Sequence, residues 1–155
     1  MEYQLIDSSR SEDIARLAVC LTNEIIERTG VQHFDVDVPL AIGLCENYLD
    51  SGAYQVMAAL DGDRVAGFAA ITESCSLYAE GRFGIVQELY VLPEYRSQAV
   101  GKSLLEAVVA LGRQQGWRRL ELCTPPVPEF ERTVSFYQAN GFEITGGYKM
   151  KYMIS

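Results

Sequence analysis

The feature that most constrains the fold is residues 85–115, where a strand-like segment enters a helix through a turn of small and polar residues. The segment "IVQELYVLPEY" has the apolar, aromatic and β-branched composition of a strand. From Val100 to about Gln115 the apolar residues recur at helical spacing, and Gly116 follows as a stop signal. The turn "RSQAVGK" at 96–102 therefore places a helix N-terminus directly after a strand.

A helix N-terminus carries unpaired backbone N–H groups and a partial positive charge, which together favour phosphate. Ser97, Ala99 and Gly101 have the small side chains that allow close approach, and Arg96 and Lys102 add positive charge at the rim. We expect this turn to hold a pyrophosphate, although a turn with a purely structural role would look similar. It is no Walker A loop, because the residue five before Gly101 is not a glycine, and no GxGxxG follows an early strand.

The rest of the chain alternates between helical and strand-like patterns. Helices are predicted at 11–28, with a capping box from Ser9 to Glu12, and from Asp37 and Pro39 to about Leu49. Strands are predicted at "YQVMAAL", "RVAGFAAIT", "FGIVQELYVL" and "WRRLELCT", with a polar connection at "ESCSLYAEGR". A last helix at "EFERTVSFYQAN" ends before Gly141, and "FEITGGYKMKYMI" is predicted as a terminal strand.

This order, β-α-α-β-β-β-α-β-α-β, predicts an α/β fold with a mixed central sheet and helices on both faces. The 155 residues suit a single domain, 1–155. The N-terminus has no pattern of a signal peptide and no stretch is apolar enough to span a membrane, so we expect a cytoplasmic protein.

Charge and cysteine content narrow the classes of function. A net charge of −8 argues against nucleic-acid binding, and it suits a cationic amine substrate or simply solubility. No two of the four cysteines lie within four residues, which excludes a CxxC-type metal site, and we expect reduced, buried thiols. His33 is the single histidine, in a predicted loop, so a Cys–His nucleophilic pair has little support.

Two motifs carry a resemblance to a known family. The stretch "ELYVLPEYRSQAVGKSLLEA" resembles the signature of the GNAT superfamily, the acyl-CoA-dependent N-acetyltransferases, and "SFYQANGFE" resembles its FY-x-x-x-GF motif. The resemblance covers nearly the whole chain and is strongest from Val86 to Glu143. Ala99 replaces the first glycine of the phosphate loop, which is tolerated at a negative φ and costs about 1 kcal/mol at a positive φ. Phe130 stands where the family often has an asparagine.

The resemblance implies a GNAT-like, mostly antiparallel sheet in which a splayed pair of strands admits the pantetheine arm of acetyl-CoA. The arm would pair with the backbone of residues 89–91, and the turn would surround the pyrophosphate. The implied cofactor-binding residues are Leu89, Tyr90, Val91, Arg96, Ser97, Gln98, Ala99, Val100, Gly101 and Lys102.

The implied chemistry is direct attack of an amine on the thioester in a ternary complex, with a backbone N–H stabilising the oxyanion. Tyr137 matches the family's tyrosine near the cofactor sulfur and is the candidate acid, although it can also serve only in packing. Glu88 is the candidate base because burying a carboxylate in an apolar strand is costly and suggests a function. A purely structural carboxylate is the alternative. Acidic residues in loops, with weaker support as acceptor contacts, are Asp35, Asp37, Glu73 and Glu80.

These inferences identify an N-acetyltransferase that uses acetyl-CoA, needs no metal, and acts on a primary amine of a small molecule. A protein N-terminus or lysine is an alternative acceptor. A third possibility is a catalytically weak acyl-CoA-binding regulatory domain. The resemblance also allows a homodimer in which the terminal segment pairs across an interface.

Overall fold

The computed structural model describes residues 1–32 and 35–154. His33 therefore lies outside the described residues. The chain divides into two compact units, Met1–Leu122 and Cys123–Ser155, and each is described by itself. Whether 1–155 acts as a single domain stays a prediction. Among the described residues, no helix combines the length and the hydrophobicity needed to cross a bilayer.

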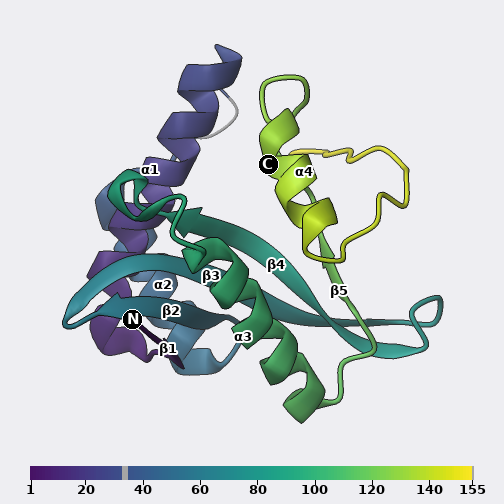
Figure 1. Cartoon of the computed structure of the whole chain (residues 1–155), viewed down its shortest axis with the longest axis horizontal. Helices are drawn as coiled ribbons and strands as arrows, with labels where there is room; N and C mark the ends of the chain where they lie inside the picture. Colours follow the sequence, from purple (N-terminus) through teal and green to yellow (C-terminus); the bar gives the residue numbers. More distant parts are fainter. Residues whose placement is uncertain (33–34, 155) are drawn as a thin grey trace. The chain divides into compact units, whose positions relative to one another are not determined.

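The first unit is built on a five-stranded sheet with the order β1-β2-β3-β4-β5 (Figure 1). The first four strands pair antiparallel with their neighbours, and β5 pairs parallel to β4. This confirms the mixed, mostly antiparallel sheet. The strands are β1 (Glu2–Leu5), β2 (Gln55–Asp61), β3 (Arg64–Ser76), β4 (Gly81–Val91) and β5 (Leu120–Leu122).

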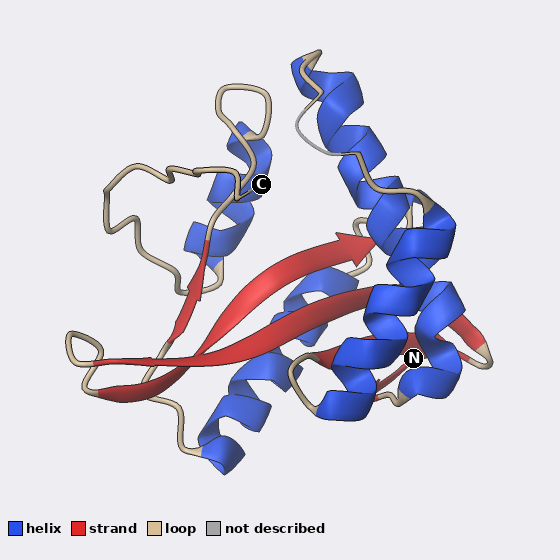
Figure 2. Ribbon diagram, turned by 180° about the vertical axis from the view of Figure 1, so that it is seen from behind, coloured by secondary structure: helices blue, strands red, loops and turns tan. Residues whose placement is uncertain are grey.

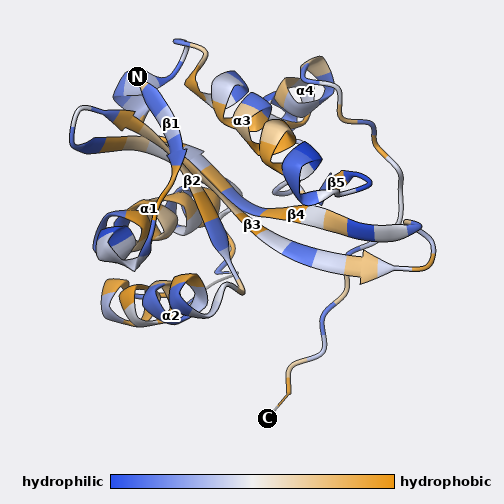
Figure 3. Cartoon of the chain, turned by 90° about the horizontal axis from the view of Figure 1, so that it is seen from below, coloured by the Kyte–Doolittle hydropathy of each residue, from blue (hydrophilic) through white to orange (hydrophobic). Residues whose placement is uncertain are grey.

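Helices cover both faces of this sheet, as predicted. The helices α1 (Ser11–Thr29) and α2 (Val38–Ser51) lie on one face, and α3 (Val100–Gln115) lies on the other (Figure 3). The α1/α2 face buries a core that includes Ile14, Val56 and Phe68, and the α3 face buries one that includes Ile71 and Leu104. Two short 3-10 turns, η1 (Ser8–Arg10) and η2 (Pro93–Tyr95), precede α1 and α3.

Two side-chain caps were predicted at helix N-termini, one by Asp37 and one by Ser9. Asp37 caps α2 as expected, because its carboxylate accepts a hydrogen bond from the backbone N–H of Leu40 at 2.8 Å. The capping box predicted at Ser9 is wrong. Ser9 lies inside η1, its backbone N–H donates to the carboxylate of Asp7, and α1 begins two residues later.

Two strand boundaries differ from the prediction. The stretch expected as a polar connection is largely strand, because β3 continues to Ser76 and β4 begins at Gly81. Alternating polar residues are compatible with a hairpin that has one face in solvent. The strand expected at "WRRLELCT" is limited to β5, since only Leu120–Leu122 pair with β4.

The second unit contains one described helix, α4 (Glu131–Ala139), and the terminal strand predicted at 142–154 is not formed there. Gly146 and Gly147 interrupt the segment with positive φ values of 93° and 85°. A strand also needs a partner, and no ladder includes these residues. The large apolar side chains that consequently remain more than 70% exposed are Ile144, Tyr148, Met150, Tyr152, Met153 and Ile154.

The cysteines are free thiols, in line with the expected reduced state. Only Cys45 is buried, however, and Cys20, Cys75 and Cys123 are exposed. The expectation that all four are buried is wrong, because a helix or strand with one solvent-facing side can carry a cysteine on that side.

Candidate active site

The turn before α3 ends in a helix N-terminus that no side chain caps. The cap position is Ala99, which has no oxygen to accept a hydrogen bond, and the structure shows no side-chain cap hydrogen bond there. The helix α2 differs, because Asp37 fills the corresponding place. The first-turn N–H groups of α3 therefore remain available to an anion, and the helix dipole favours a negative charge at this point.

The backbone of this turn is strained at two non-glycine residues. Ser97 has φ 63° and Ala99 has φ 62°, both in the left-handed region that disfavours a Cβ atom. Each such residue costs about 1 kcal/mol or more. Ser97, Gln98 and Ala99 are exposed, so this conformation is held by the turn itself rather than by a surrounding core. Ala99 therefore has a positive φ, the case in which its methyl group was expected to cost about 1 kcal/mol.

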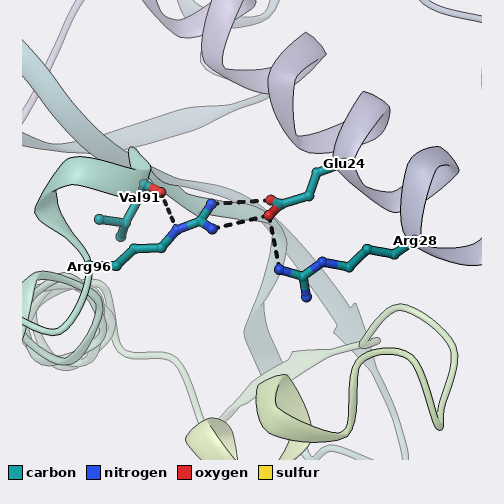
Figure 4. A network of polar contacts seen from close by, with 4 residues as sticks. All are labelled: Glu24, Arg28, Val91 and Arg96. Atoms are coloured by element: carbon teal, nitrogen blue, oxygen red, sulfur yellow. Dashed lines mark hydrogen bonds and ion pairs between the residues drawn. The ribbon is translucent and has the colours of Figure 1, made fainter.

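Arg96 faces α1 rather than standing as a free cation at the rim of the turn (Figure 4). Its guanidinium donates to both carboxylate oxygens of Glu24 at 3.0 and 3.1 Å and to the backbone carbonyl of Val91 at 2.9 Å. It also stacks over the Tyr90 ring, 5.3 Å from the centroid. Arg96 therefore fixes the position of the turn against α1, and it shares the Glu24 carboxylate with Arg28, which donates to Glu24 at 3.0 Å.

The other polar residues of the turn have looser ties. The side-chain amide of Gln98 donates to the backbone carbonyl of Glu94 at 3.0 Å, which closes the turn onto η2. Lys102 is exposed and lies 4.0 Å from Glu106, one helical turn along α3. A pair this exposed contributes little stability, so the Lys102 ammonium can turn toward an anion at the N-terminus at little cost.

β4 separates from β5 before the chain reaches this turn. The two strands pair only over Gly84–Val86 and Leu120–Leu122, while β4 continues to Val91 (Figure 2). A bulge at Gln87 marks the point of separation: Val86 pairs with Ile71 and Glu88 pairs with Ala70, which leaves Gln87 without a partner position. The edge of β4 beyond Val86 can therefore accept an extended chain.

The bulge also decides which face each side chain takes. Val86, Leu89 and Val91 pack in the core under α3, whereas Tyr90 packs under α1 and α2. Glu88, two residues before Tyr90, shares the α1/α2 face. Without the extra residue, Glu88 would follow Val86 onto the α3 face.

Glu88 is half-buried, and its carboxylate accepts a hydrogen bond from the hydroxyl of Tyr54 at 2.6 Å. Burial raises the pKa of Glu88, and the Tyr54 hydrogen bond opposes this by lowering it. The net pKa is above the usual value, which moves this carboxylate toward the range useful for a general base at neutral pH.

Tyr137 lies on α4, in the second unit. It is buried, with its ring 5.2 Å from that of Phe136 and 5.4 Å from that of Phe142. Burial raises the pKa of Tyr137 to about 12, so the phenol is protonated at neutral pH. Phe130, the residue before α4, is also buried.

The weaker candidates have structural partners. Asp37 caps α2. Glu73 accepts hydrogen bonds from Arg82 and from the indole N–H of Trp117. Glu80 pairs with Arg118. These three carboxylates are accounted for by the fold, whereas Asp35 lies exposed in the loop before α2.

Sequence reasoning missed Tyr54 and Glu24, which hold Glu88 and Arg96. Tyr54 reads as the first residue of an apolar strand, and Glu24 reads as one of several charges on the polar face of a helix. Each pairs with a residue more than 30 positions away. Neither has a local pattern that could have identified its role.

The sequence model of the acetyltransferase (GNAT) domain matches residues 52–144. An uncharacterized N-acetyltransferase of Archaeoglobus fulgidus is 30% identical over 67 residues, which are 43% of this chain and 46% of the relative. The aminoalkylphosphonate N-acetyltransferase of Salmonella typhimurium is 29% identical over 110 residues, which are 71% of this chain and 66% of the relative. The chain thus spans about half of one relative and just under two thirds of the other.

The fold is shared with solved structures. An aminoglycoside N-acetyltransferase in complex with CoA superposes with a TM-score of 0.78, at 20% identity, over 98% of this chain and 93% of that chain. The region matched by the family's sequence model includes β2 to α4, with both the turn before α3 and the motif around Tyr137. Because this region is more than half of its length, the chain belongs to the GNAT family of acetyltransferases.

Proposed function

We propose that this protein transfers the acetyl group of acetyl-CoA to a primary amine of a small molecule, by direct attack in a ternary complex. The observation that carries the proposal is the uncapped N-terminus of α3, which follows the stretch of β4 that has separated from β5. One end of this region suits a phosphate and the other suits an extended chain, and acetyl-CoA combines both in one molecule.

The residues present fit this donor. The N–H groups in the first turn of α3, from Val100 to Lys102, would hold the pyrophosphate, and the Lys102 ammonium would add charge. The backbone of residues 89–91 would pair with the pantetheine arm. Acetyl-CoA supplies a thioester carbonyl that is activated toward an amine. The backbone N–H groups on the free edge of β4 would donate to the carbonyl oxygen as it gains negative charge.

Glu88 is the proposed general base. An amine is protonated at neutral pH and must lose a proton before it can attack. One oxygen of the Glu88 carboxylate accepts a hydrogen bond from Tyr54, and the other would take this proton, directly or through a water. The raised pKa of Glu88 favours this transfer, because a stronger base holds the proton better.

Tyr137 is the proposed general acid. Burial holds its pKa at about 12, so it carries a proton at any physiological pH. It would donate a hydrogen bond from this proton to the sulfur as the C–S bond breaks; because the thiolate is a weaker base than the Tyr137 phenolate, the raised pKa of Tyr137 opposes complete transfer of the proton.

A small amine is the favoured acceptor. The Salmonella relative is an aminoalkylphosphonate N-acetyltransferase by name, and aminoalkylphosphonates are small primary amines. The net charge of −8 suits a cationic amine of either acceptor class and does not separate them. A protein N-terminus or lysine has no specific observation in its favour.

The test is an acceptor screen with purified protein and acetyl-CoA, in which release of the free thiol is measured. The panel contains aminoalkylphosphonates, aminoglycosides, polyamines and peptides with a free N-terminus or lysine. Acetylation of a small amine would support the proposal, and acetylation of peptides alone would replace the acceptor class. Tight binding of acetyl-CoA by calorimetry with no turnover on any amine would indicate an acyl-CoA-binding regulatory domain instead.

A further inference from the structure

A tyrosine outside both family motifs contacts the proposed base. Tyr54 is the residue before β2, and Glu88 is on β4, with β3 between the two strands. The Tyr54 hydroxyl donates to Oε2 of Glu88 at 2.6 Å. This length is typical of a hydrogen bond from a hydroxyl to an ionised carboxylate, which is about twice as strong as a neutral one.

The surroundings keep this hydroxyl a donor. Burial and the neighbouring Glu88 charge raise the pKa of Tyr54 far above its usual value, so the phenol does not ionise. The Tyr48 ring lies 5.6 Å from that of Tyr54, at an interplanar angle of 55°. Tyr54 therefore remains protonated at neutral pH and can donate to Glu88.

Side chains of α2, and one from the start of α1, also influence the pKa values around the pair. Cys45 is buried near both members, and burial, followed by the Glu88 and Glu46 charges, raises the pKa of its thiol. Ser11, at the start of α1, interacts with the same thiol. Tyr48 and Cys45 each raise the pKa of Tyr54 further. The Tyr54 hydroxyl, in contrast, lowers the pKa of Glu88 and so stabilises its charged form.

We propose that Tyr54 is a positioning residue for acetyl transfer: its hydroxyl fixes Oε2 of Glu88, orients Oε1 toward the acceptor amine, and keeps the carboxylate ionised. The inference rests on the proposed function, in which Glu88 is the base. In the proton transfer, the N–H bond of the ammonium breaks and an O–H bond forms at Oε1. The bond from Tyr54 to Oε2 persists on both sides of this step.

A structural role for the pair predicts different behaviour. If the hydrogen bond only stabilised the fold, its loss would lower the melting temperature and leave the pH dependence of activity unchanged. If Tyr54 positions and tunes the base, its loss makes Glu88 harder to ionise. The acid limb of the pH profile then moves to higher pH, because activity requires the carboxylate.

The experiment uses Tyr54→Phe, with Tyr48→Phe as the matched control from the same aromatic pair. Protein labelled with ¹³C at the glutamate carboxyl carbons is titrated by NMR, and the Glu88 signal is assigned by its absence in Glu88→Gln. We expect the Glu88 midpoint to move to higher pH in Tyr54→Phe and to stay in place in Tyr48→Phe. An unchanged midpoint in folded Tyr54→Phe protein would overturn the proposal.

A kinetic measurement tests the consequence for catalysis. We expect Tyr54→Phe to lower kcat about tenfold at pH 7, as for loss of a hydrogen bond to a charged group, with the Kd for acetyl-CoA unchanged. The acid limb of the profile should follow the NMR midpoint, and a limb that stays in place would contradict the inference. If the wild type acetylates no amine, the proposed function fails, yet the NMR titration still decides whether Tyr54 controls Glu88.

Discussion

The turn at residues 96–102 and the Tyr54–Glu88 pair differ in which atoms carry the proposed function. The turn presents backbone N–H groups at a helix end without a side-chain cap, and Ser97, Gln98 and Ala99 are exposed. The pair presents two side-chain oxygen atoms 2.6 Å apart, from two half-buried residues on the α1/α2 face. The turn is continuous in the sequence, whereas the pair joins residues separated by 34 positions.

This difference determines how each region responds to substitution. In the turn, most side chains can change without loss of the N–H groups, so bulk, charge and backbone conformation decide the outcome. In the pair, a single atom matters most: without the Tyr54 hydroxyl oxygen, the hydrogen bond that stabilises the charged form of Glu88 is lost. Substitutions in the turn should therefore act on donor binding, and substitutions in the pair should act on the pH dependence of turnover.

The largest effect is expected for Gly101→Glu. The new carboxylate would lie at the N-terminus of α3, where the turn is proposed to bind pyrophosphate, and like charges repel. A glutamate in the first turn of a helix is favoured by the helix dipole, so the variant should fold. We expect acetyl-CoA affinity to fall by at least about 100-fold, measured by isothermal titration calorimetry, which corresponds to about 3 kcal/mol.

Gly43→Glu is the matched control for this charge. Gly43 lies within α2, and an added Cβ there meets no atom within 4 Å. The same change in net charge should leave acetyl-CoA affinity within about twofold, since exposed charges further away than about 10 Å are screened at ordinary salt. Equal losses in both variants would mean that general repulsion, rather than the turn, controls binding.

Glu88→Gln should give the next largest effect, and it should act on turnover rather than on acetyl-CoA binding. Loss of a general base lowers kcat by about 10²–10⁴-fold, and the acid limb of the pH profile should vanish with the titrating group. In the wild type that limb should lie above the usual glutamate range, because burial raises the pKa of Glu88. Steady-state rates from pH 5 to 9 measure both. An acid limb that persists in Glu88→Gln would assign it to another group.

The same substitution has a stability consequence of known sign. The folded-state pKa of Glu88 is raised, so the folded protein binds this proton more tightly than the unfolded chain does. The stability from this group is present below the unfolded pKa and is lost as pH rises through the folded pKa. Glu88→Gln should thus gain melting temperature relative to the wild type at pH 8 and gain less at pH 5. Thermal melts followed by circular dichroism check this difference.

Tyr137→Phe tests the proposed general acid, which lies in the second unit. Removing the proposed acid should lower kcat about 100-fold without changing the Kd for acetyl-CoA. Because burial raises the pKa of Tyr137 to about 12, its ionisation should leave no basic limb in the wild-type profile below pH 10. Tyr152→Phe, at an 89% exposed tyrosine of the same unit, is the control. Comparable losses of kcat in both variants would argue against a specific role for Tyr137.

The sequence predicted features that depend on neighbours along the chain. The helix 100–115, its stop at Gly116 and the Asp37 cap were predicted correctly, because each depends on residues a few positions apart. The strand predicted at 142–154 was wrong, because strand propensity forms a strand only where a partner exists. The short span of β5 has the same cause, since pairing with β4 sets its length.

The same distinction holds for the candidate site. A local motif identified the turn, and an isolated carboxylate in an apolar strand identified Glu88. The partners Tyr54 and Glu24 were missed because their contacts exist only after the sheet and helices pack. The backbone angle of Ala99 was not predictable either, because alanine is compatible with either sign of φ at a cost that the rest of the turn determines.

Ala99→Gly should give the smallest effect, and its sign is opposite to that of the others. At φ 62° the Ala99 methyl group is strained by about 1 kcal/mol, and glycine removes that strain. Glycine also has greater freedom in the unfolded chain, which offsets about half of the gain or more. We expect an increase in the free energy of unfolding of less than about 1 kcal/mol by urea denaturation, and a few-fold tighter binding of acetyl-CoA.

Ala110→Gly separates relief of strain from a general effect of glycine. Ala110 lies in the middle of α3 and is exposed to solvent. Glycine there costs about 1 kcal/mol, because it loses more backbone conformational freedom on folding than alanine does. The two alanine-to-glycine changes, at positions 99 and 110, should therefore move stability in opposite directions. If both destabilise the protein equally, the turn does not hold Ala99 in the left-handed conformation in solution.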